Sequence, residues 1–530
     1  MKKNVVILIC TLVVLVTMVL PTSALAKQKQ PVAFTNQSKE TYNPQVKHTV
    51  FTPLAVTDFD PLDTTINVTV SINEIRALQL SNPDLYVKVN INDRTFISDV
   101  WQNMKYVEHP DWSASCVVPK DKEFVNITIE LWDEKTGLLC DISPDSGNFT
   151  QARTVELTYS IAAGIWWGDD DYLEDPSGYG RLNGCDDNSI YQQDRDCELF
   201  FNITQTDFDG DGLPYWLEVN MYNTSPLINN RGEDADHDGI PIEWEYTFGL
   251  TYFEWGHDEG YYFIYDPFHW ENYTALDEDE DGLNDIEEYK TWQWGSDPFR
   301  QDIFIEIDQM AKGPNGEGGN PVPTLAYDLV RDSMAKHNIV WHIDDGRLGG
   351  GEFIPFKMDY TDQDITQWYW TYFMHKDYNN WRRGVFRWCI VPYNDPFAKG
   401  FTFSSRINNT SALDCFLLSS LYHDKRGNQY FPLLVRKTLD KETNRAIIYA
   451  GAMMHETGHT LGIYNPGVDN HRGYLPWQID YWRYGPYKSS MNYRYIYNGI
   501  VDYSDGSRGK NDFDDYTQMD LTLINPGHHW

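Results

Sequence analysis

The stretch AIIYAGAMMHETGHTLGI, residues 446 to 463, decides how the second half of this chain folds. Its apolar and small residues favour one buried helix. His455 and His459 stand four positions apart, so both imidazoles lie on one face of that helix and can reach a single zinc ion. Because two histidines and a glutamate in an apolar helix need a satisfied polar environment, a metal site is favoured over a chance match.

Glu456 lies beside the two histidines and is not a ligand in this arrangement. Zinc lowers the pKa of a bound water, Glu456 is placed to take its proton, and the activated water can attack a peptide carbonyl. Gly462 is expected to end the helix, and a third zinc ligand should follow this turn. Farther on, KSSMNY places Met491 in a Ser-rich turn, with Tyr493 two residues later.

Taken together, HETGHTLG and SSMNY resemble the metzincin metallopeptidases, and pappalysin-like members in particular. The family pattern is HExxHxxGxx followed by His or Asp, then a Met-turn beneath the zinc. The resemblance extends from Asp302 to the end of the chain. It implies zinc ligation by His455 and His459, general-base catalysis by Glu456, a Met-turn at Met491, and stabilisation of the tetrahedral oxyanion by Tyr493.

The sequence departs from this pattern at the third ligand. Asn465 stands at that position, and a neutral amide is a poor zinc ligand. We predict Asp469 as the third ligand, with His471 and Asn465 as alternatives. Asn465 also supports a different function, a catalytically inactive calcium-binding surface or adhesion protein with a protease-like domain. The retained Glu456 argues against such a loss of activity.

The surrounding sequence predicts a C-terminal α/β (α+β) domain over residues 301–530. Strands are expected at 302–308, 338–343 and 386–393, and a helix at 324–337. A mixed sheet with helices packed on it, one of them the active-site helix, follows from this alternation. This is the metzincin-like catalytic domain of the predicted architecture.

Residues 201–300 contain the EF-hand pattern three times, with Asp at alternate positions, then Gly, and Glu at the last position. Calcium takes six to eight oxygen ligands, and three copies in register argue against a merely solvated acidic turn. The loops resemble thrombospondin type 3 and dockerin modules, which predicts a spacer with about three structural Ca²⁺ ions. The expected ligands are Asp207, Asp209, Asp211, Glu218, Asp234, Asp236, Asp238, Glu245, Asp277, Asp279, Asp281 and Glu288.

Short β-rich runs predict an N-terminal β-sandwich over residues 58–165. The stretches NPDLYVKVNIND and VNITIELWDEK resemble the C-2 domain, which implies Asp84, Asp133 and Asp141 as calcium-loop positions. The family's set of aspartates is incomplete here, so a sandwich without calcium stays open. Residues 166–200 are expected to form an irregular, disulfide-closed connector packed by aromatic side chains.

The beginning of the chain predicts export. Residues 1–26 have the basic start, apolar middle and small-residue cleavage site of a signal peptide, although an uncleaved anchor stays open. A disordered lead-in is expected over 27–57. A net charge of −37 excludes nucleic acid as a partner and makes membrane contact weak or absent apart from such an anchor. The predicted location is secreted or cell-surface.

Six cysteines follow the signal, and an even number in an exported chain predicts disulfides. Sequence neighbours suggest the pairs Cys116 with Cys140, Cys185 with Cys197, and Cys389 with Cys415, among fifteen possible connectivities. Recurrent Asn-x-Ser/Thr sequons predict a glycoprotein. The sequence therefore predicts a multidomain, calcium-stabilised zinc metalloendopeptidase that acts on polypeptide substrates.

Overall fold

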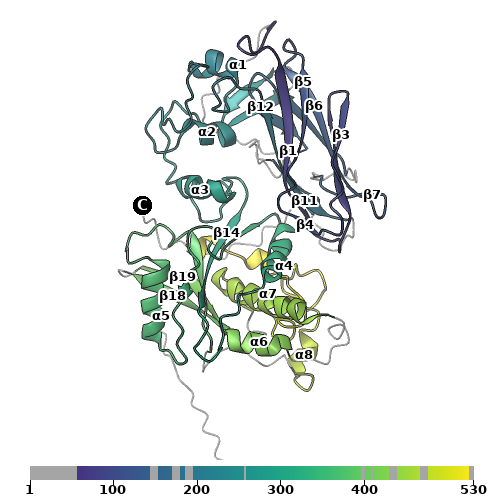
Figure 1. Ribbon diagram of the computed structural model, residues 1–530. Helices are drawn as coiled ribbons and strands as arrows, with labels where there is room; N and C mark the ends of the chain where they lie inside the picture. Colours follow the sequence, from purple (N-terminus) through teal and green to yellow (C-terminus); the bar gives the residue numbers. More distant parts are fainter. Residues whose placement is uncertain are drawn as a thin grey trace, which may run out of the picture. The chain divides into compact units, whose positions relative to one another are not determined.

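The computed structural model describes residues 56–143, 153–169, 180–185, 195–255, 258–394, 400–407, 410–428, 439–465 and 475–524. Within them the chain forms several β-sheets and few helices (Figure 1), which confirms the predicted multidomain architecture with a β-sandwich. The predicted signal and nearly all of the predicted lead-in lie outside these residues. None of the helices described has the length and apolar character needed to span a membrane.

The N-terminal sandwich consists of two antiparallel sheets. One has the order β10 (Gly180–Asn183), β11 (Cys197–Gln205), β1 (Ile66–Ala77) and β4 (Tyr106–Val107), with β5 (Trp112–Val118) also paired to β1. The other has the order β3 (Arg94–Ile97), β2 (Leu85–Ile91), β6 (Phe124–Asp133), β8 (Val155–Ser160) and β9 (Trp166–Gly168), with β7 (Leu138–Leu139) on β6.

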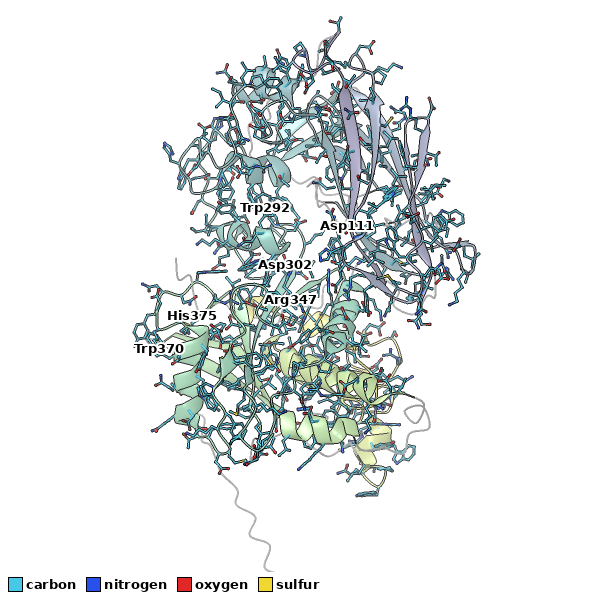
Figure 2. The ribbon with its side chains drawn as sticks, viewed as in Figure 1. Asp111, Trp292, Asp302, Arg347, Trp370 and His375 are labelled. Atoms are coloured by element: carbon cyan, nitrogen blue, oxygen red, sulfur yellow. The ribbon has the colours of Figure 1, made fainter. Side chains whose placement is uncertain are left out.

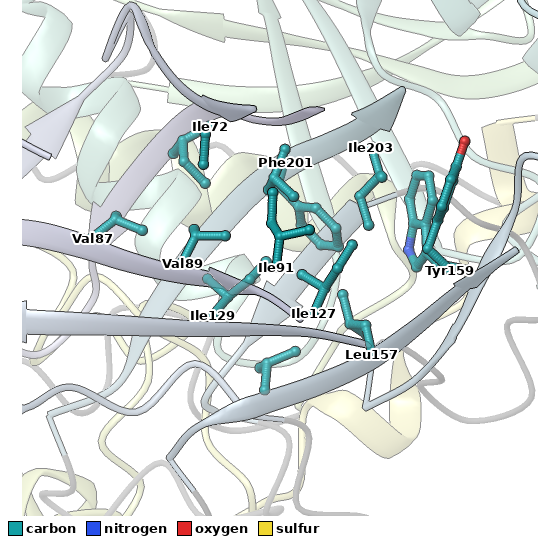
Figure 3. Close-up of a cluster of buried hydrophobic side chains, with 14 of the residues drawn as sticks. Ile72, Val87, Val89, Ile91, Ile127, Ile129, Leu157, Tyr159, Phe201 and Ile203 are labelled. Atoms are coloured by element: carbon teal, nitrogen blue, oxygen red, sulfur yellow. The ribbon is translucent and has the colours of Figure 1, made fainter. Parts of the chain in front are cut away.

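The sandwich core follows from alternation along the strands. In β2 every second residue is buried, as expected for a strand with one face on a core. Figure 3 shows Ile72, Phe201 and Ile203 of the first sheet facing side chains of the second sheet, among them Val89 and Ile127. Two apolar inner faces therefore hold the two sheets together.

The sandwich extends beyond its predicted boundary at residue 165. Within the segment predicted as an irregular connector, β9 extends one sheet, and β10 and β11 belong to the other. The long β11 pairs with β1 from Val68 to Ala77. The Asp- and Gly-rich composition concealed these strands, because part of the segment alternates only weakly between apolar and polar residues.

The middle segment carries short elements between the acidic loops. These are α1 (Tyr215–Leu217), the π-helical turn η1 (Glu218–Tyr222), α2 (Ile242–Gly249), β12 (Leu250–Trp255), β13 (Asp258–Phe263), α3 (Asp285–Thr291) and η2 (Trp292–Trp294). Each predicted calcium loop runs directly into a short helical element rather than a helix of full EF-hand length. The acidic loops are therefore not flanked by pairs of long helices in the described residues, and the spacer stays a prediction.

The C-terminal domain is built on a mixed sheet. Its order is β15 (Val340–Asp344), β14 (Asp302–Met310), β17 (Phe386–Val391), β19 (Thr410–Leu418) and β18 (Gly400–Ile407), with β16 (Phe353–Ile354) also paired to β14. All pairs are parallel except β18 with β19, so β18 is an antiparallel edge strand.

Helices cover both faces of this sheet. One core joins Ile303, Ile305 and Ile307 of β14 to α4 (Thr324–Ala335) and α7 (Lys441–Thr460), and α6 (Ser420–Asn428) packs on α7. The other core includes Phe304 with α5 (Asp362–Trp368) and η3 (Tyr369–Phe373). The remaining elements are α8 (Ile479–Arg483), η5 (Tyr516–Gln518) and η6 (Leu521–Ile524).

The predicted cysteine pairs are not formed. Cys389 and Cys415 lie on neighbouring strands, but they belong to the cores on opposite faces of the sheet. The thiol of Cys140 instead lies beside Cys197, and a hydrogen bond between these thiols lowers the pKa of Cys140. The pairing of sequence neighbours failed because strand pairing, not sequence distance, decides which cysteines meet.

Candidate metal centres

Helix α7 carries the HETGH residues in its last turns. Asp440 caps the start of the helix by accepting a hydrogen bond from the backbone N–H of Thr443 at 2.9 Å. The helix continues to Thr460, close to its predicted end, and Gly462 follows with a positive φ of 76°. His455 and Glu456 are buried, with 2% and 6% of their surface exposed.

Backbone carbonyls orient both histidines. The Nδ1 of His455 lies 2.9 Å from the carbonyl oxygen of Ser490, and the Nδ1 of His459 lies 3.2 Å from that of Ile463. Because a carbonyl only accepts, each Nδ1 carries the proton and each neutral ring presents a lone pair at Nε2. Burial lowers the pKa of His459, which favours its neutral form.

The two Nε2 atoms lie 3.3 Å apart. Zinc bonds of about 2.0–2.1 Å at tetrahedral angles place neighbouring ligand nitrogens roughly 3.3–3.4 Å apart. Without a cation or a proton between them, two lone pairs at this distance repel each other. The histidine pair therefore fits zinc in its spacing, in its orientation and in the carbonyls that hold the rings.

Met491 packs against the histidine helix. A Cβ atom added to Gly458 would lie 2.3 Å from the Met491 sulfur and 3.1 Å from the Tyr503 hydroxyl. Met491 is fully buried, so glycine at position 458 is what permits the close approach of the turn. The predicted Met-turn residue thus lies against the helix between His455 and His459.

A buried carboxylate holds this Ser-rich turn. Asp515 accepts hydrogen bonds at 2.5 Å from the hydroxyls of both Ser489 and Tyr487. The Ser489 oxygen in turn accepts the Met491 backbone N–H at 3.0 Å. Burial raises the pKa of Asp515 to about 6, although these hydrogen bonds oppose the shift. Asp515 therefore supports the Met-turn through the hydroxyl of Ser489.

Glu456 points toward the edge strand β18. The Thr402 hydroxyl lies 3.1 Å from a Glu456 carboxylate oxygen and 2.8 Å from the Glu456 carbonyl oxygen. A Cβ atom at Gly400 would lie 2.6 Å from the other carboxylate oxygen. The Tyr493 ring packs edge-on against His455, with centroids 5.1 Å apart. The structure thus brings the predicted base and the predicted oxyanion residue to the two histidines.

Asn465 belongs to the network around Asp515. Its amide nitrogen donates to the Tyr487 hydroxyl at 2.8 Å and to Asp515 at 3.1 Å, and its oxygen accepts from Gln518 at 3.2 Å. These bonds give the amide a structural role, so the structure does not favour Asn465 as the third ligand. Asp469 and His471 lie outside the described residues.

The three acidic loops have the same internal hydrogen bonds. The backbone N–H of each motif glycine donates to the first aspartate, at 2.7 Å in the first loop, 3.1 Å in the second and 3.2 Å in the third. The glycines have positive φ values of 96°, 106° and 92°, which explains the need for glycine. Carboxylate oxygens of the three aspartates in each loop lie within 4.8 Å of one another. These clusters can hold metal ions.

The glutamate that ends each loop is buried with an unsatisfied oxygen. Glu218, Glu245 and Glu288 are at most 1% exposed, and each has at least one buried carboxylate oxygen without a hydrogen-bond partner. Burial and the neighbouring aspartates raise the pKa of Glu218 to about 8 and that of Glu245 to about 9. Such carboxylates need a cation or a proton, and the last position of the loop is where calcium takes a bidentate glutamate.

The structure adds acidic groups that sequence reasoning missed. Asp302, which begins β14, joins Asp281 and Glu288, and its position at the start of a buried strand was the available signal. Glu306, Asp308 and Glu352 form another group on the sheet, where Arg382 pairs with Glu306. His342 lies 2.5 Å from Asp302, so it is a hydrogen-bonded core histidine.

The aspartates implied by the C-2 resemblance form no such group among the described residues. Asp133 instead pairs with Arg195 at 2.8 Å and accepts the backbone N–H of Asp84. Burial raises its pKa, but these bonds lower it more, so the net shift is downward. Asp141 accepts the backbone N–H of Ser143 at 3.2 Å. This geometry favours a structural sandwich without a calcium site at these positions.

Comparison with known proteins finds only weak structural similarity. No family model matches the chain, and no curated protein matches it. Extended synaptotagmin 2 matches with 12% identity over 27% of this chain and 25% of that chain, at a TM-score of 0.17. A C-2 domain structure matches with 13% identity over 26% of this chain and 97% of that chain, at a TM-score of 0.15.

Human GIVD cytosolic phospholipase A2 matches with 16% identity over 27% of this chain and 17% of that chain, at a TM-score of 0.16. At these TM-scores the likenesses support no conclusion about this chain. The C-2 and metzincin resemblances stay predictions.

Proposed function

We propose that this protein is a calcium-stabilised zinc metalloendopeptidase of the metzincin type, secreted or held at the cell surface. The observation that carries the proposal is the pair of Nε2 atoms of His455 and His459, 3.3 Å apart, with each Nδ1 bound to a backbone carbonyl. Met491 against Gly458 supports the same proposal, because the pattern has a methionine turn beneath its metal.

The residues of the site have distinct roles in peptide hydrolysis. His455 and His459 would hold the zinc ion, which when bound lowers the pKa of a water molecule and polarises a carbonyl group. Glu456 takes the proton of the attacking water and later delivers it to the leaving amine. Tyr493, beside His455, donates a hydrogen bond to the oxyanion of the tetrahedral intermediate.

The hydrogen bond from Thr402 positions the Glu456 carboxylate. Because Thr402 lies on β18, the edge strand of the sheet, this bond fixes the base relative to that edge. The same hydroxyl also contacts the Glu456 carbonyl, so it ties the strand to the helix. In the proposed enzyme, Thr402 is a positioning residue.

Calcium has a structural role in this proposal. The acidic loops place many carboxylates close together, and the buried glutamate at the end of each loop lacks a partner for at least one oxygen. Bound Ca²⁺ would supply that partner and neutralise the repulsion between the carboxylates. Removal of calcium is expected to loosen the segment between the two larger domains.

Glu456→Ala tests the catalytic role. The variant should lose peptide hydrolysis by a factor of about 100 or more, because general-base catalysis contributes on the order of 10²–10⁴. It should retain zinc, since Glu456 is not a ligand. Cleavage of a denatured protein substrate and the zinc content of the same sample are the two measurements.

Glu442→Gln is the matched control, because Glu442 lies in the exposed first turn of the same helix. Its activity should equal that of the wild type. If wild-type protein binds zinc but Glu456→Ala leaves the hydrolysis rate unchanged, the catalytic proposal is wrong. If wild-type protein binds zinc and cleaves no polypeptide, the alternative of an inactive surface protein is favoured.

A further inference from the structure

The third acidic loop recruits a carboxylate from outside its motif. Asp302 is the first residue of β14, and its backbone N–H donates to the Asp281 carboxylate at 2.7 Å. Oxygen atoms of Asp281, Glu288 and Asp302 lie within 4.8 Å of one another, and all three residues are buried. Figure 2 labels Asp302 at the start of the C-terminal sheet. The third loop and this sheet therefore share one acidic cluster.

The buried Glu288 carboxylate needs a cation or a proton. It is 1% exposed, and neither of its oxygens has a hydrogen-bond partner. One oxygen of Asp279 is also buried without a partner. Within the described part of the chain, no lysine or arginine forms an ion pair with Asp281, Glu288 or Asp302. Among the described residues, His342 beside Asp302 is the one basic side chain within ion-pair distance of these three carboxylates, and it does not reach Glu288, so the cluster calls for protons or a metal ion.

Asp302 retains the capacity to bind a cation. One of its oxygens accepts from the Ser296 hydroxyl and from the Asp297 backbone N–H, both at 3.1 Å, and the other lies 2.5 Å from His342. These contacts fix the orientation of the carboxylate. Because an ionised carboxylate offers about four lone-pair positions, a metal–oxygen bond can still be added.

We propose that Asp302 is a further ligand of the calcium ion bound by the third loop, so that one ion joins the loop segment to the C-terminal sheet. This rests on the calcium binding included in the proposed function and adds a ligand that lies outside the loop motif. Asp277, Asp279, Asp281 and Glu288 supply the motif carboxylates, and Asp302 supplies a fifth. Five carboxylates account for most of the six to eight oxygens that calcium requires.

The shared cluster also contacts the end of the histidine helix. A Cβ atom at Gly282 would lie 2.8 Å from the Cα atom of Thr522, so the third loop packs directly on η6. Next to η6, the Asp520 backbone N–H donates to the carbonyl oxygen of Leu461, the residue that follows α7, at 2.9 Å. Calcium at the third loop therefore supports the segment that follows His459.

Asp302→Asn in the full-length chain tests the proposal, with Asp209→Asn of the first loop as the matched variant. Calcium titration should show one site weakened on the order of tenfold or more in each variant, because a charged ligand is lost. Thermal unfolding should then show a smaller calcium-induced rise in Tm for Asp302→Asn than for wild type. In EDTA its Tm should be equal to or above that of wild type, because one of the crowded buried charges is gone.

Two outcomes overturn the proposal. One is a calcium titration of Asp302→Asn that matches wild type while Glu288→Gln loses a site, which leaves the calcium loops of the proposed function intact. The other is a Tm of Asp302→Asn lowered equally in EDTA and in calcium, which assigns Asp302 a hydrogen-bonding role alone. Zinc content measured on the same samples reports separately on the proposed peptidase.

Discussion

At the scale of single residues, tautomers and protonation depend on what each ring nitrogen contacts. Backbone carbonyls accept from Nδ1 of both His455 and His459, so each Nε2 can face a metal, and burial lowers the pKa of His459. His337 is a half-buried histidine that has no part in the proposed zinc site. Its ring stacks on Tyr516 with centroids 3.5 Å apart, and burial lowers its pKa to about 4.

His337 makes the stability of the fold depend on pH. Below a pH of about 6.5 the unfolded histidine binds a proton, whereas the folded one stays neutral until the pH approaches 4. The free energy of unfolding should therefore fall on acidification through this window, by on the order of 2–3 kcal/mol from this group.

We expect His337→Phe, which keeps an aromatic ring against Tyr516, to lose less stability than wild type between pH 7 and pH 4 in urea unfolding. His269→Gln, at an exposed histidine, should behave like wild type. Equal pH dependence of His337→Phe and wild type would show that His337 is not the responsible group.

At the scale of elements, the packing of α7 on the Met-turn allows a double-variant test. Alanine inside a helix is normally favoured over glycine by up to about 1 kcal/mol. At Gly458 the added methyl group would meet the Met491 sulfur, and overpacking typically costs about 1–3 kcal/mol. Gly458→Ala should therefore lower the Tm and weaken zinc binding.

Met491→Ala should cost less stability in the Gly458→Ala background than in wild type, because there it also removes the collision between the two side chains. Both effects can be measured by thermal unfolding with and without a zinc chelator. If Gly458→Ala has a higher Tm than wild type, the Met491 side chain does not pack as closely on the helix as the structure indicates.

The elements also show what sequence patterns can and cannot predict. The strand predicted at 302–308 begins at its predicted residue and extends to Met310, and the histidine helix was located from its composition. The strands β10 and β11 were missed, because their partner β1 lies far away in the sequence. Asp302 was predicted as part of a strand, but only the three-dimensional structure brings it to Glu288.

At the scale of the whole molecule, charged side chains join the sandwich to the C-terminal domain. The fully buried Arg76 of β1 lies 3.0 Å from Asp332 of α4, and Lys105 lies 2.6 Å from the same carboxylate group. Local sequence patterns do not reveal such partners, because 256 positions separate Arg76 from Asp332 and 227 separate Lys105 from it.

The central claim is that the HETGH helix holds one zinc ion. It is tested most directly by the zinc content of the purified full-length protein in excess calcium, measured by mass spectrometry on wild type, Asp469→Ala and His471→Ala. We expect one zinc ion per wild-type chain and its loss in one of the two variants, which would identify the third ligand. A wild-type protein that binds no zinc would contradict the account.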